Sequence, residues 1–309
     1  MSTEEKMVNC MNIAYIFKTS LGSINGSWTE GNVSTVKKIT LPNGNLLPYV
    51  SGQSLKYQIR KAWREMGLAS LLSEVQQAEK AAGVDFTLGE PDKYIDDDLL
   101  GFMIASTGEN RRRTAVARTS AAIGMFPYKG DRDLGTKSKE QSGDMSAGGN
   151  IFETEVYYNY FKVNILIELD RLGNFQPFEL QEKKAANIEL KLRKERLIYF
   201  LSALTHIWGG GKQSRLLTDM SPKFLAITFQ NKKAPIFLET LSMDDNENLN
   251  TIAFSEVLND NKSIITNQFV GIQSGIFKNN VAKELNDTTS IQTAFEKAQK
   301  LINDENFKF

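Results

Sequence analysis

VYYNYFKVNILIELD, residues 156–170, is the segment on which the fold prediction rests. Apolar and more polar side chains alternate along it, with Phe161, Val163, Ile165, Ile167 and Leu169 at every second position. Because successive strand residues point to opposite faces, this period of two predicts a long strand with one packed face. The other face of the strand would then be open to a ligand.

This strand is one of six expected core elements, and the order of the six along the chain predicts the fold class. They are a strand at 12–18, a helix at 54–66, an extended segment at 115–126, the strand at 156–170, a helix at 182–208, and a hairpin of 224–229 with 236–241. The order strand, helix, strand, strand, helix, strand is that of a ferredoxin-like or RNA-recognition-motif-like (RRM-like) sheet with both helices on one face. The sequence therefore predicts an α+β fold.

Three further segments lie outside this predicted core. Residues 67 to about 110 resemble an inserted subdomain, with a helix expected at 71–82. Residues 129–150 are rich in Gly, Ser, Asp and Lys, with Met145 their only large apolar side chain after Leu134, which predicts a projecting loop. A terminal helix is expected at 290–303.

The predicted helix at 54–66 has two distinct faces. Leu55, Ile59, Ala62 and Met66 share one face at helical spacing, and Ser51 or Ser54 could cap the helix start. Lys56, Arg60 and Arg64 form a cationic stripe beside that apolar face. Such a stripe is either a solvated surface or a binding surface for an anion.

Two short segments, SGQSLK at 51–56 and GGGKQS at 209–214, combine small residues with a lysine and hydroxyl or amide side chains. Small residues let the backbone approach a polyanion and donate N–H groups to it. Each segment alone is also typical of a helix cap or turn. Together they predict a track for a phosphate backbone.

Composition limits the type of nucleic-acid contact. The 309 residues contain 37 Lys and Arg and 37 Asp and Glu, so binding would depend on local basic patches rather than on net charge. Residues 99–130 hold one acid, Glu109, and five bases, whereas 242–260 hold five acids and no base. Solvated loops often show the same separation of acidic and basic residues along the sequence.

The single cysteine and the hydropathy pattern indicate the compartment. Cys10 cannot form an intramolecular disulfide, which is typical of a reducing cytosol, and it is expected to be a small buried residue. We find neither an apolar run of about 18 residues nor a signal-peptide pattern at the start. We expect a cytoplasmic protein without a membrane partner.

Motifs for metal or nucleotide chemistry fit poorly. His206 is the only histidine and is expected to pack or cap a helix end. The GGGKQS segment lacks the first Gly and the final Ser or Thr of the phosphate-binding loop found in nucleotide-hydrolysing proteins. The segment 244–248 begins like a calcium-binding loop but lacks the Gly and the distal Glu that such a loop needs. The three aspartates at 96–98 are typical of a helix start or an exposed turn. We therefore predict no catalytic residue, metal or cofactor.

The segments 48–60, 113–126 and 209–214, in this order and spacing, resemble the DevR/Cst-type RAMP proteins. These are backbone subunits of type I CRISPR surveillance complexes (Cascade), and the resemblance is strongest to type I-B. It spans roughly residues 10–240. It implies a modified RRM described as a hand: a palm at 10–66, 113–126 and 153–241, fingers at 67–112, a thumb loop or hairpin at 127–152, and a C-terminal extension at 242–309.

The resemblance also implies what the protein binds. Copies associate head to tail along one CRISPR guide RNA, together with other Cascade subunits, and the guide pairs with target DNA. Met145 is the candidate wedge at the thumb, although a randomly exposed methionine is an equal alternative. The implied RNA-binding residues are Ser51, Gln53, Ser54, Lys56, Arg60, Arg111, Arg112, Arg113, Lys212, Gln213 and Ser214.

Two other functions remain as alternatives. Related type III backbone subunits cleave RNA with an aspartate in the loop after the first strand, where this chain has Asn32 and the neighbouring acid Glu30. A metal-dependent endoribonuclease would have to use Glu30 or the acids at 96–98, because an asparagine cannot act as the carboxylate ligand or base. A purely structural subunit that touches no RNA is the third hypothesis.

Overall fold

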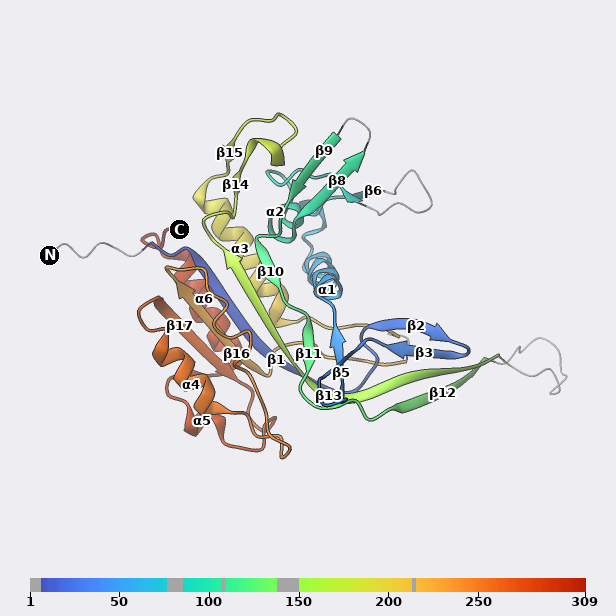
Figure 1. Cartoon of the computed structure of the whole chain (residues 1–309). Coiled ribbons are helices and arrows are strands. Elements are labelled where there is room, and N and C mark those ends of the chain that lie inside the picture. Colours follow the sequence, from blue (N-terminus) through green and yellow to red (C-terminus); the bar gives the residue numbers. More distant parts are fainter. Residues whose placement is uncertain (1–6, 77–85, 107–108, 138–149, 213–214) are drawn as a thin grey trace.

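A computed structural model describes residues 7–76, 86–106, 109–137, 150–212 and 215–309, and it is dominated by one mixed sheet of 12 strands (Figure 1). Its longest strand is β13 (Asn150–Glu168), the segment on which the sequence prediction rested. The other strands are β1 (Cys10–Gly22), β2 (Gly26–Glu30), β3 (Val33–Val36), β4 (Lys38–Thr40), β5 (Leu46–Val50), β10 (Ala117–Thr119), β11 (Ala122–Gly124), β12 (Asp131–Lys137), β16 (Phe224–Gln230), β17 (Ile265–Ile272) and β18 (Thr288–Thr289).

The centre of the sheet is antiparallel. β1 pairs with β13 on one side, with Ile13 opposite Ile165, and with β16 on the other, with Ile13 opposite Ile227. β13 also pairs with β10 and β11, so the four central positions are occupied by β16, β1, β13 and then β10 with β11. Strands that are distant in sequence thus become direct neighbours.

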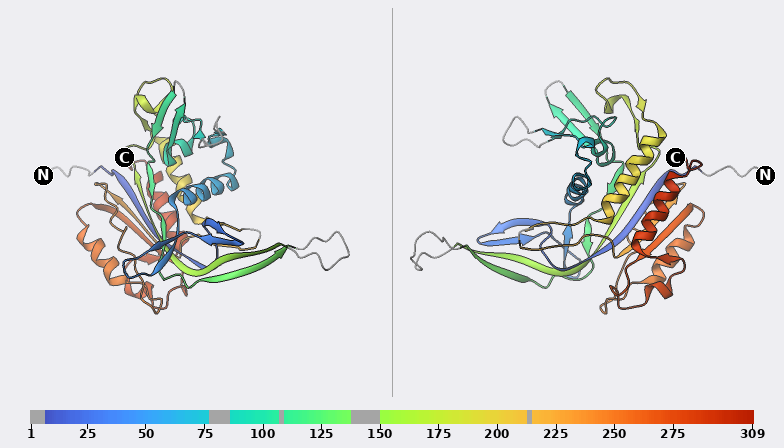
Figure 2. Two further views of the ribbon diagram at one scale, coloured as in Figure 1. Left: turned by 45° about the vertical axis from the view of Figure 1, so that its right-hand side comes forward. Right: turned by 180° about the vertical axis from the view of Figure 1, so that it is seen from behind.

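Three helices cover one face of this sheet: α1 (Gly52–Glu65), α3 (Leu190–Thr205) and α6 (Ile291–Asn303). The reverse view in Figure 2 shows α3 and α6 lying over the strands of the sheet. Phe161, Val163 and Ile165 point into this core, as their alternation predicts. The predicted face of α1 is confirmed for Leu55, Ile59 and Ala62, whereas Met66 lies beyond the helix end and is exposed.

The opposite face carries a second, smaller core. Ala14, Ile16 and Phe224 from the central strands pack there against residues 237–285. That region includes α4 (Thr251–Asp260) and α5 (Val281–Glu284), which lie in front of β16 and β17 in Figure 1. The C-terminal quarter of the chain therefore covers part of the sheet face that the sequence left open to a ligand.

Short elements form an attachment above α1 and α3 (Figure 1). Two separate two-stranded ladders contribute to it, and a third joins residues 174–175 to 186–187. The elements are η1 (Ala69–Leu71), β6 (Val75–Gln76), β7 (Phe86–Thr87), α2 (Ile95–Leu100), β8 (Phe102–Ser106), β9 (Glu109–Arg113), β14 (Asn174–Phe175), η2 (Pro177–Glu179) and β15 (Ala186–Asn187).

The segment predicted as a projecting loop forms strands in its described part. β12 pairs with the first half of β13, from Asp131 opposite Val156 to Lys137 opposite Asn150, and both strands run away from the body (Figure 1). β3 lies parallel to β13 on its other edge. Residues 138–149, with the candidate wedge Met145, lie outside the described residues.

Two predicted elements were wrong, and a third, the helix expected at 182–208, was correct only in part. The helix expected at 182–208 begins only at Leu190, because 186–187 pair as a strand with β14. The helix expected at 71–82 is replaced in its described part by η1 and β6. The hairpin partner expected at 236–241 contains no strand, and β16 instead pairs with β17, which follows much later in the chain.

Two other predictions, the terminal helix and the burial of Cys10, are confirmed. The terminal helix α6 starts at the cap Ser290, whose Oγ accepts a hydrogen bond from the Thr293 amide at 3.1 Å. Cys10 is fully buried, and its burial raises the pKa of the thiol to about 11. Among the described residues, no helix is long and apolar enough to cross a membrane.

Candidate nucleic-acid interface

The first candidate segment forms the N-terminus of α1. Ser51 is the N-cap residue, and its Oγ accepts a hydrogen bond from the Ser54 amide at 3.3 Å. Gly52 is required because a Cβ there would lie 2.9 Å from the Thr119 carbonyl oxygen of β10. Gln53 is exposed in the first turn, where helix amides lack intrahelical partners and the helix dipole favours an anion.

The cationic stripe of α1 is partly used inside the protein. Lys56 Nζ donates to the Leu100 carbonyl at the end of α2 at 2.9 Å. Burial, reinforced by the charge of Arg60, lowers the pKa of Lys56 below its ordinary value. Arg60 Nε binds Asp96 Oδ2 at 3.0 Å, with 22% of the arginine side chain still exposed. Both cations therefore join α1 to the inserted segment and retain only part of their surface for a ligand.

The second candidate segment follows α3. The Gly211 amide donates to the Ile24 carbonyl at 2.7 Å, and a Cβ on Gly211 would lie 2.5 Å from the Ser23 carbonyl oxygen. Lys212 has the left-handed φ of 58°, is exposed, and donates from Nζ to Ser34 Oγ of β3 at 3.1 Å. Gln213 and Ser214 lie outside the described residues.

One turn, formed by Ile24 and Asn25, connects the two candidate segments. Ile24 accepts the hydrogen bond from Gly211, and Asn25 Oδ1 accepts one from the Ser51 amide at 2.8 Å. The Ile24 amide in turn donates to the hydroxyl of the buried Tyr157 at 3.1 Å, which holds the turn on β13. Two segments about 160 positions apart in the sequence thus meet at adjacent residues.

The arginine run at 111–113 is placed differently from the prediction. Arg113 has no exposed side-chain surface, and Arg111 is buried with its guanidinium donating to the Gly89 carbonyl at 2.5 Å. A guanidinium inside the protein cannot reach a phosphate without breaking these bonds, so the expected RNA contact of Arg111 and Arg113 does not fit the structure. Arg112, between them on β9, is exposed.

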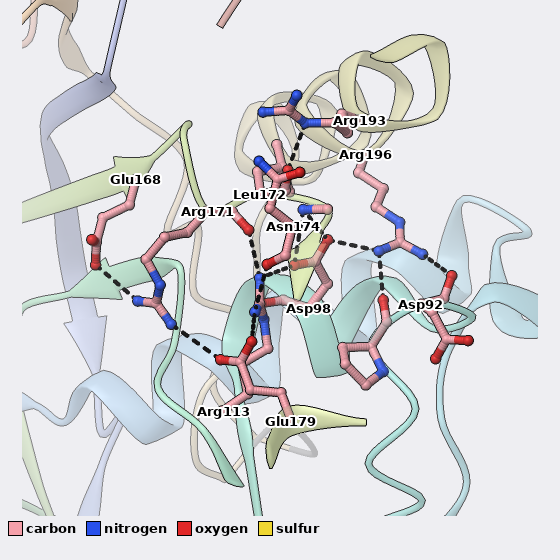
Figure 3. Close-up of polar contacts among 12 residues, drawn as sticks. Asp92, Asp98, Arg113, Glu168, Arg171, Leu172, Asn174, Glu179, Arg193 and Arg196 are labelled. Atoms are coloured by element: carbon pink, nitrogen blue, oxygen red, sulfur yellow. Dashed lines mark hydrogen bonds and ion pairs between the residues drawn. The ribbon is translucent and has the colours of Figure 1, made fainter. Parts of the chain in front are cut away.

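Arg113 belongs to a buried carboxylate–guanidinium cluster that sequence reasoning missed (Figure 3). Asp98 binds Arg113 at 2.7 Å and Arg196 at 2.6 Å, and Arg113 also binds Glu179 at 2.7 Å. At most 4% of each of these four side chains is exposed. The cluster joins α2, β9, η2 and α3, and complete pairing is what makes such burial tolerable.

The acids of the endoribonuclease hypothesis are also placed by the structure. Asp96, Asp97 and Asp98 begin α2, as one of the two expectations had it, but they are 1%, 0% and 0% exposed rather than at the surface. Asp97 accepts hydrogen bonds from the Thr87 hydroxyl and the Glu90 amide, so all three carboxylates have partners. Within the described ranges, no group of three or more His, Cys, Asp or Glu is arranged to hold a metal.

A further surface feature joins the residue before the glycine run to the C-terminal half of α1. Trp208, directly before the glycine run, is 39% exposed, and its indole Nε1 donates to Glu65 Oε2 of α1 at 2.9 Å. Lys61 Nζ lies 3.4 Å from the centre of the indole ring. The sequence offered only the adjacency of Trp208 to the glycines as a signal, because Lys61 and Glu65 reach it from α1, which is far away in the sequence.

Similarity to solved structures supports the architecture. One chain titled "CRISPR RNA-guided surveillance complex, pre-nicking" superposes with a TM-score of 0.62 over 95% of this chain and 100% of that chain, at 12% identity. A second, titled "CRISPR RNA-guided surveillance complex", gives 0.57 over 94% and 98%, at 14% identity. At such low identity the likeness shows a shared fold.

Sequence comparison identifies the family. The chain is 24% identical over 239 residues to the "CRISPR-associated protein Cas7/Cst2/DevR" of Myxococcus xanthus (strain DK1622), covering 72% of this chain and 73% of that protein. The family model described as "CRISPR-associated negative auto-regulator DevR/Csa2" matches residues 13–247, well over half of the sequence. The chain therefore belongs to the DevR/Csa2 family of CRISPR-associated proteins, as the resemblance predicted.

Proposed function

We propose that the chain is a non-catalytic backbone subunit that binds CRISPR RNA in a type I surveillance complex. Among the type I complexes, the chain is most similar to subunits of type I-B. The observation that carries this proposal is the meeting of the Ser51 and Gly211 segments at Ile24 and Asn25. Membership of the DevR/Csa2 family and the fold shared with chains of RNA-guided surveillance complexes support it.

The grip on RNA is independent of base sequence. The first-turn amides of α1, the side chains of Ser51 and Gln53, and Lys212 hold guide phosphates, and Lys56, Arg60 and Arg112 add positive charge at the border. Phosphate contacts carry no base information, so pairing between guide and target supplies the specificity. Gln213 and Ser214 would extend the same track.

The assembly follows from the hand-like organisation. The central sheet with α1 and α3 acts as an RRM-like palm, 67–112 as fingers, and the arm of β12 and β13 as a thumb with Met145 as wedge. Copies associate head to tail along the guide with other Cascade subunits and support pairing with target DNA. Each copy contributes a modest affinity for the phosphates, and the association of neighbouring copies on one RNA makes the overall binding stable.

The test is the salt dependence of binding to single-stranded RNA for Lys212→Gln. A lost phosphate contact reduces the log–log salt slope by about 0.7 in magnitude and weakens binding at low salt. Lys183→Gln is the matched control, because Lys183 is also an exposed lysine with a left-handed φ, 51° against 58°, but lies near β15. Equal salt slopes for Lys212→Gln and wild type would contradict the proposed track.

A further inference from the structure

The indole of Trp208 is held rigidly while a large part of it stays exposed. Its backbone forms an isolated bridge with Asp219, and the following Gly209 amide donates to the Thr218 carbonyl at 2.9 Å. The side chain is fixed by Glu65 at the indole N–H and by Lys61 over the ring. An aromatic ring that is fixed in this way loses little conformational entropy when a flat ligand stacks on it.

Lys61 contributes more than a packing contact. Its Nζ is buried and donates no hydrogen bond to an acceptor among the described residues, and it lies 3.6 Å from Glu65 Oε1. The ammonium group is therefore held against the ring by the cation–π attraction and by Glu65. Because Lys61 occupies one side of the ring, the 39% exposed surface of Trp208 belongs to the remainder of the indole.

This ring lies beside the proposed phosphate track. Gly209 to Lys212 follow Trp208 directly in the chain. Along α1, Lys61 is nine residues from Gly52, a rise of roughly 13 Å, which is the length of a few nucleotides. Tyr57 is 58% exposed and lies four residues before Lys61, so it shares this face of α1.

We infer that Trp208, held by Lys61 and Glu65, is a nucleobase-stacking site for single-stranded RNA, with Tyr57 as its neighbour on α1. The inference rests on the proposed function, because the phosphate track must deliver the strand. Stacking on an aromatic face tolerates every base, so the site adds affinity without reading sequence. The two candidate segments then supply the phosphate contacts, and Tyr57 and Trp208, which adjoin them in the sequence, supply the base contacts.

The experiment compares single-stranded RNA with an abasic ribose-phosphate strand of equal length. Trp208→Ala is expected to weaken RNA binding by roughly 5- to 100-fold, the effect of losing one aromatic stacking partner, and to leave binding of the abasic strand unchanged. Trp208→Phe keeps a ring and should restore most of the loss. Phe178→Ala is the control, because Phe178 is a 58% exposed aromatic residue on η2, at the opposite end of α3.

A fluorescence measurement keeps Trp208 intact. In a Trp28→Phe background the remaining tryptophans are the buried Trp63 and Trp208, so quenching by RNA reports on Trp208. Quenching by RNA but not by the abasic strand supports the site. The stacking site is overturned if Trp208→Ala weakens binding of RNA and of the abasic strand equally, or if it weakens neither and RNA causes no quenching. In either case a reduced salt slope for Lys212→Gln would still support the phosphate track. If wild type binds neither strand, the proposed function itself fails.

Discussion

The buried carboxylate–guanidinium cluster and the two segments that meet at the Ile24–Asn25 turn use polar residues for opposite purposes. In the cluster, Asp98 saturates Arg113 and Arg196 away from water. At the turn, the Ser51 amide donates to Asn25 and Lys212 Nζ donates to Ser34, while Ser51 stays partly exposed and Lys212 exposed. The difference teaches that a cation in a basic stretch of sequence is available to RNA only if no carboxylate of the same chain reaches it first.

The largest expected effect comes from breaking the cluster. Asp98→Asn leaves two buried guanidinium groups without a full counter-charge, which should lower the free energy of unfolding by about 3–5 kcal/mol. Urea denaturation of the purified protein measures the loss. The control is Asp133→Asn, whose pair with Arg215 is 42% and 28% exposed and should cost at most about 1 kcal/mol. Similar losses for both variants would show that burial does not distinguish the two pairs.

A smaller effect separates capping from RNA binding. Ser51→Ala and Ser290→Ala each remove an N-cap side chain, and each should lower the free energy of unfolding by about 1 kcal/mol. Filter binding with single-stranded RNA should show weaker binding only for Ser51→Ala, because only Ser51 lies at the proposed track. Equal RNA affinities of the two variants would leave Ser51 as a structural cap alone.

The smallest expected effect on stability concerns Glu168, an acid that is intermediate between the fully buried cluster and an exposed ion pair. Glu168 is buried but pairs with exposed cations, Arg118 and Lys233. Burial alone would raise the pKa of Glu168, but hydrogen bonds from Lys233 and Arg118 outweigh it and lower the pKa. The pairing therefore stabilises the fold above the ordinary glutamate pKa and is lost as pH falls through the lowered value.

Glu168→Gln should accordingly cost at most about 1 kcal/mol of unfolding free energy at pH 7, because its partners are solvated. The difference from wild type should disappear in acid, below the lowered pKa. Thermal unfolding from pH 7 to pH 3 measures this change. Glu239→Gln, whose 87% exposed side chain meets Lys162 at 3.8 Å, should be neutral throughout and serves as control.

Local patterns predicted those parts of the fold that carry strong periodicity. The alternation in β13, the apolar stripe of α1 and the terminal helix α6 were readable because each depends on neighbours within a few residues. The element at 236–241 failed for the opposite reason. Its apolar residues pack into the second core without forming a strand, and β17 became the partner of β16 through pairing over a long sequence separation.

The candidate site shows the same division. Ser51, Gln53 and Lys212 were found from small residues beside polar ones, and the structure keeps them at the surface or partly exposed. Arg111 and Arg113 gave an equally strong cationic signal but are buried. Trp208 was missed as a site because its two holding residues come from α1, more than 140 positions earlier in the chain.

By itself, the sequence determined the α+β class, the two small-residue segments and the family to which the chain belongs, since these depend on residue type and on spacing along the chain. Only the tertiary structure decided which cations pair with Asp96 and Asp98 and which stay exposed near Asn25. The physical reason is that charge pairing and desolvation depend on distances in space. Those distances are set when α1, α2 and α3 pack together, and no local pattern encodes them.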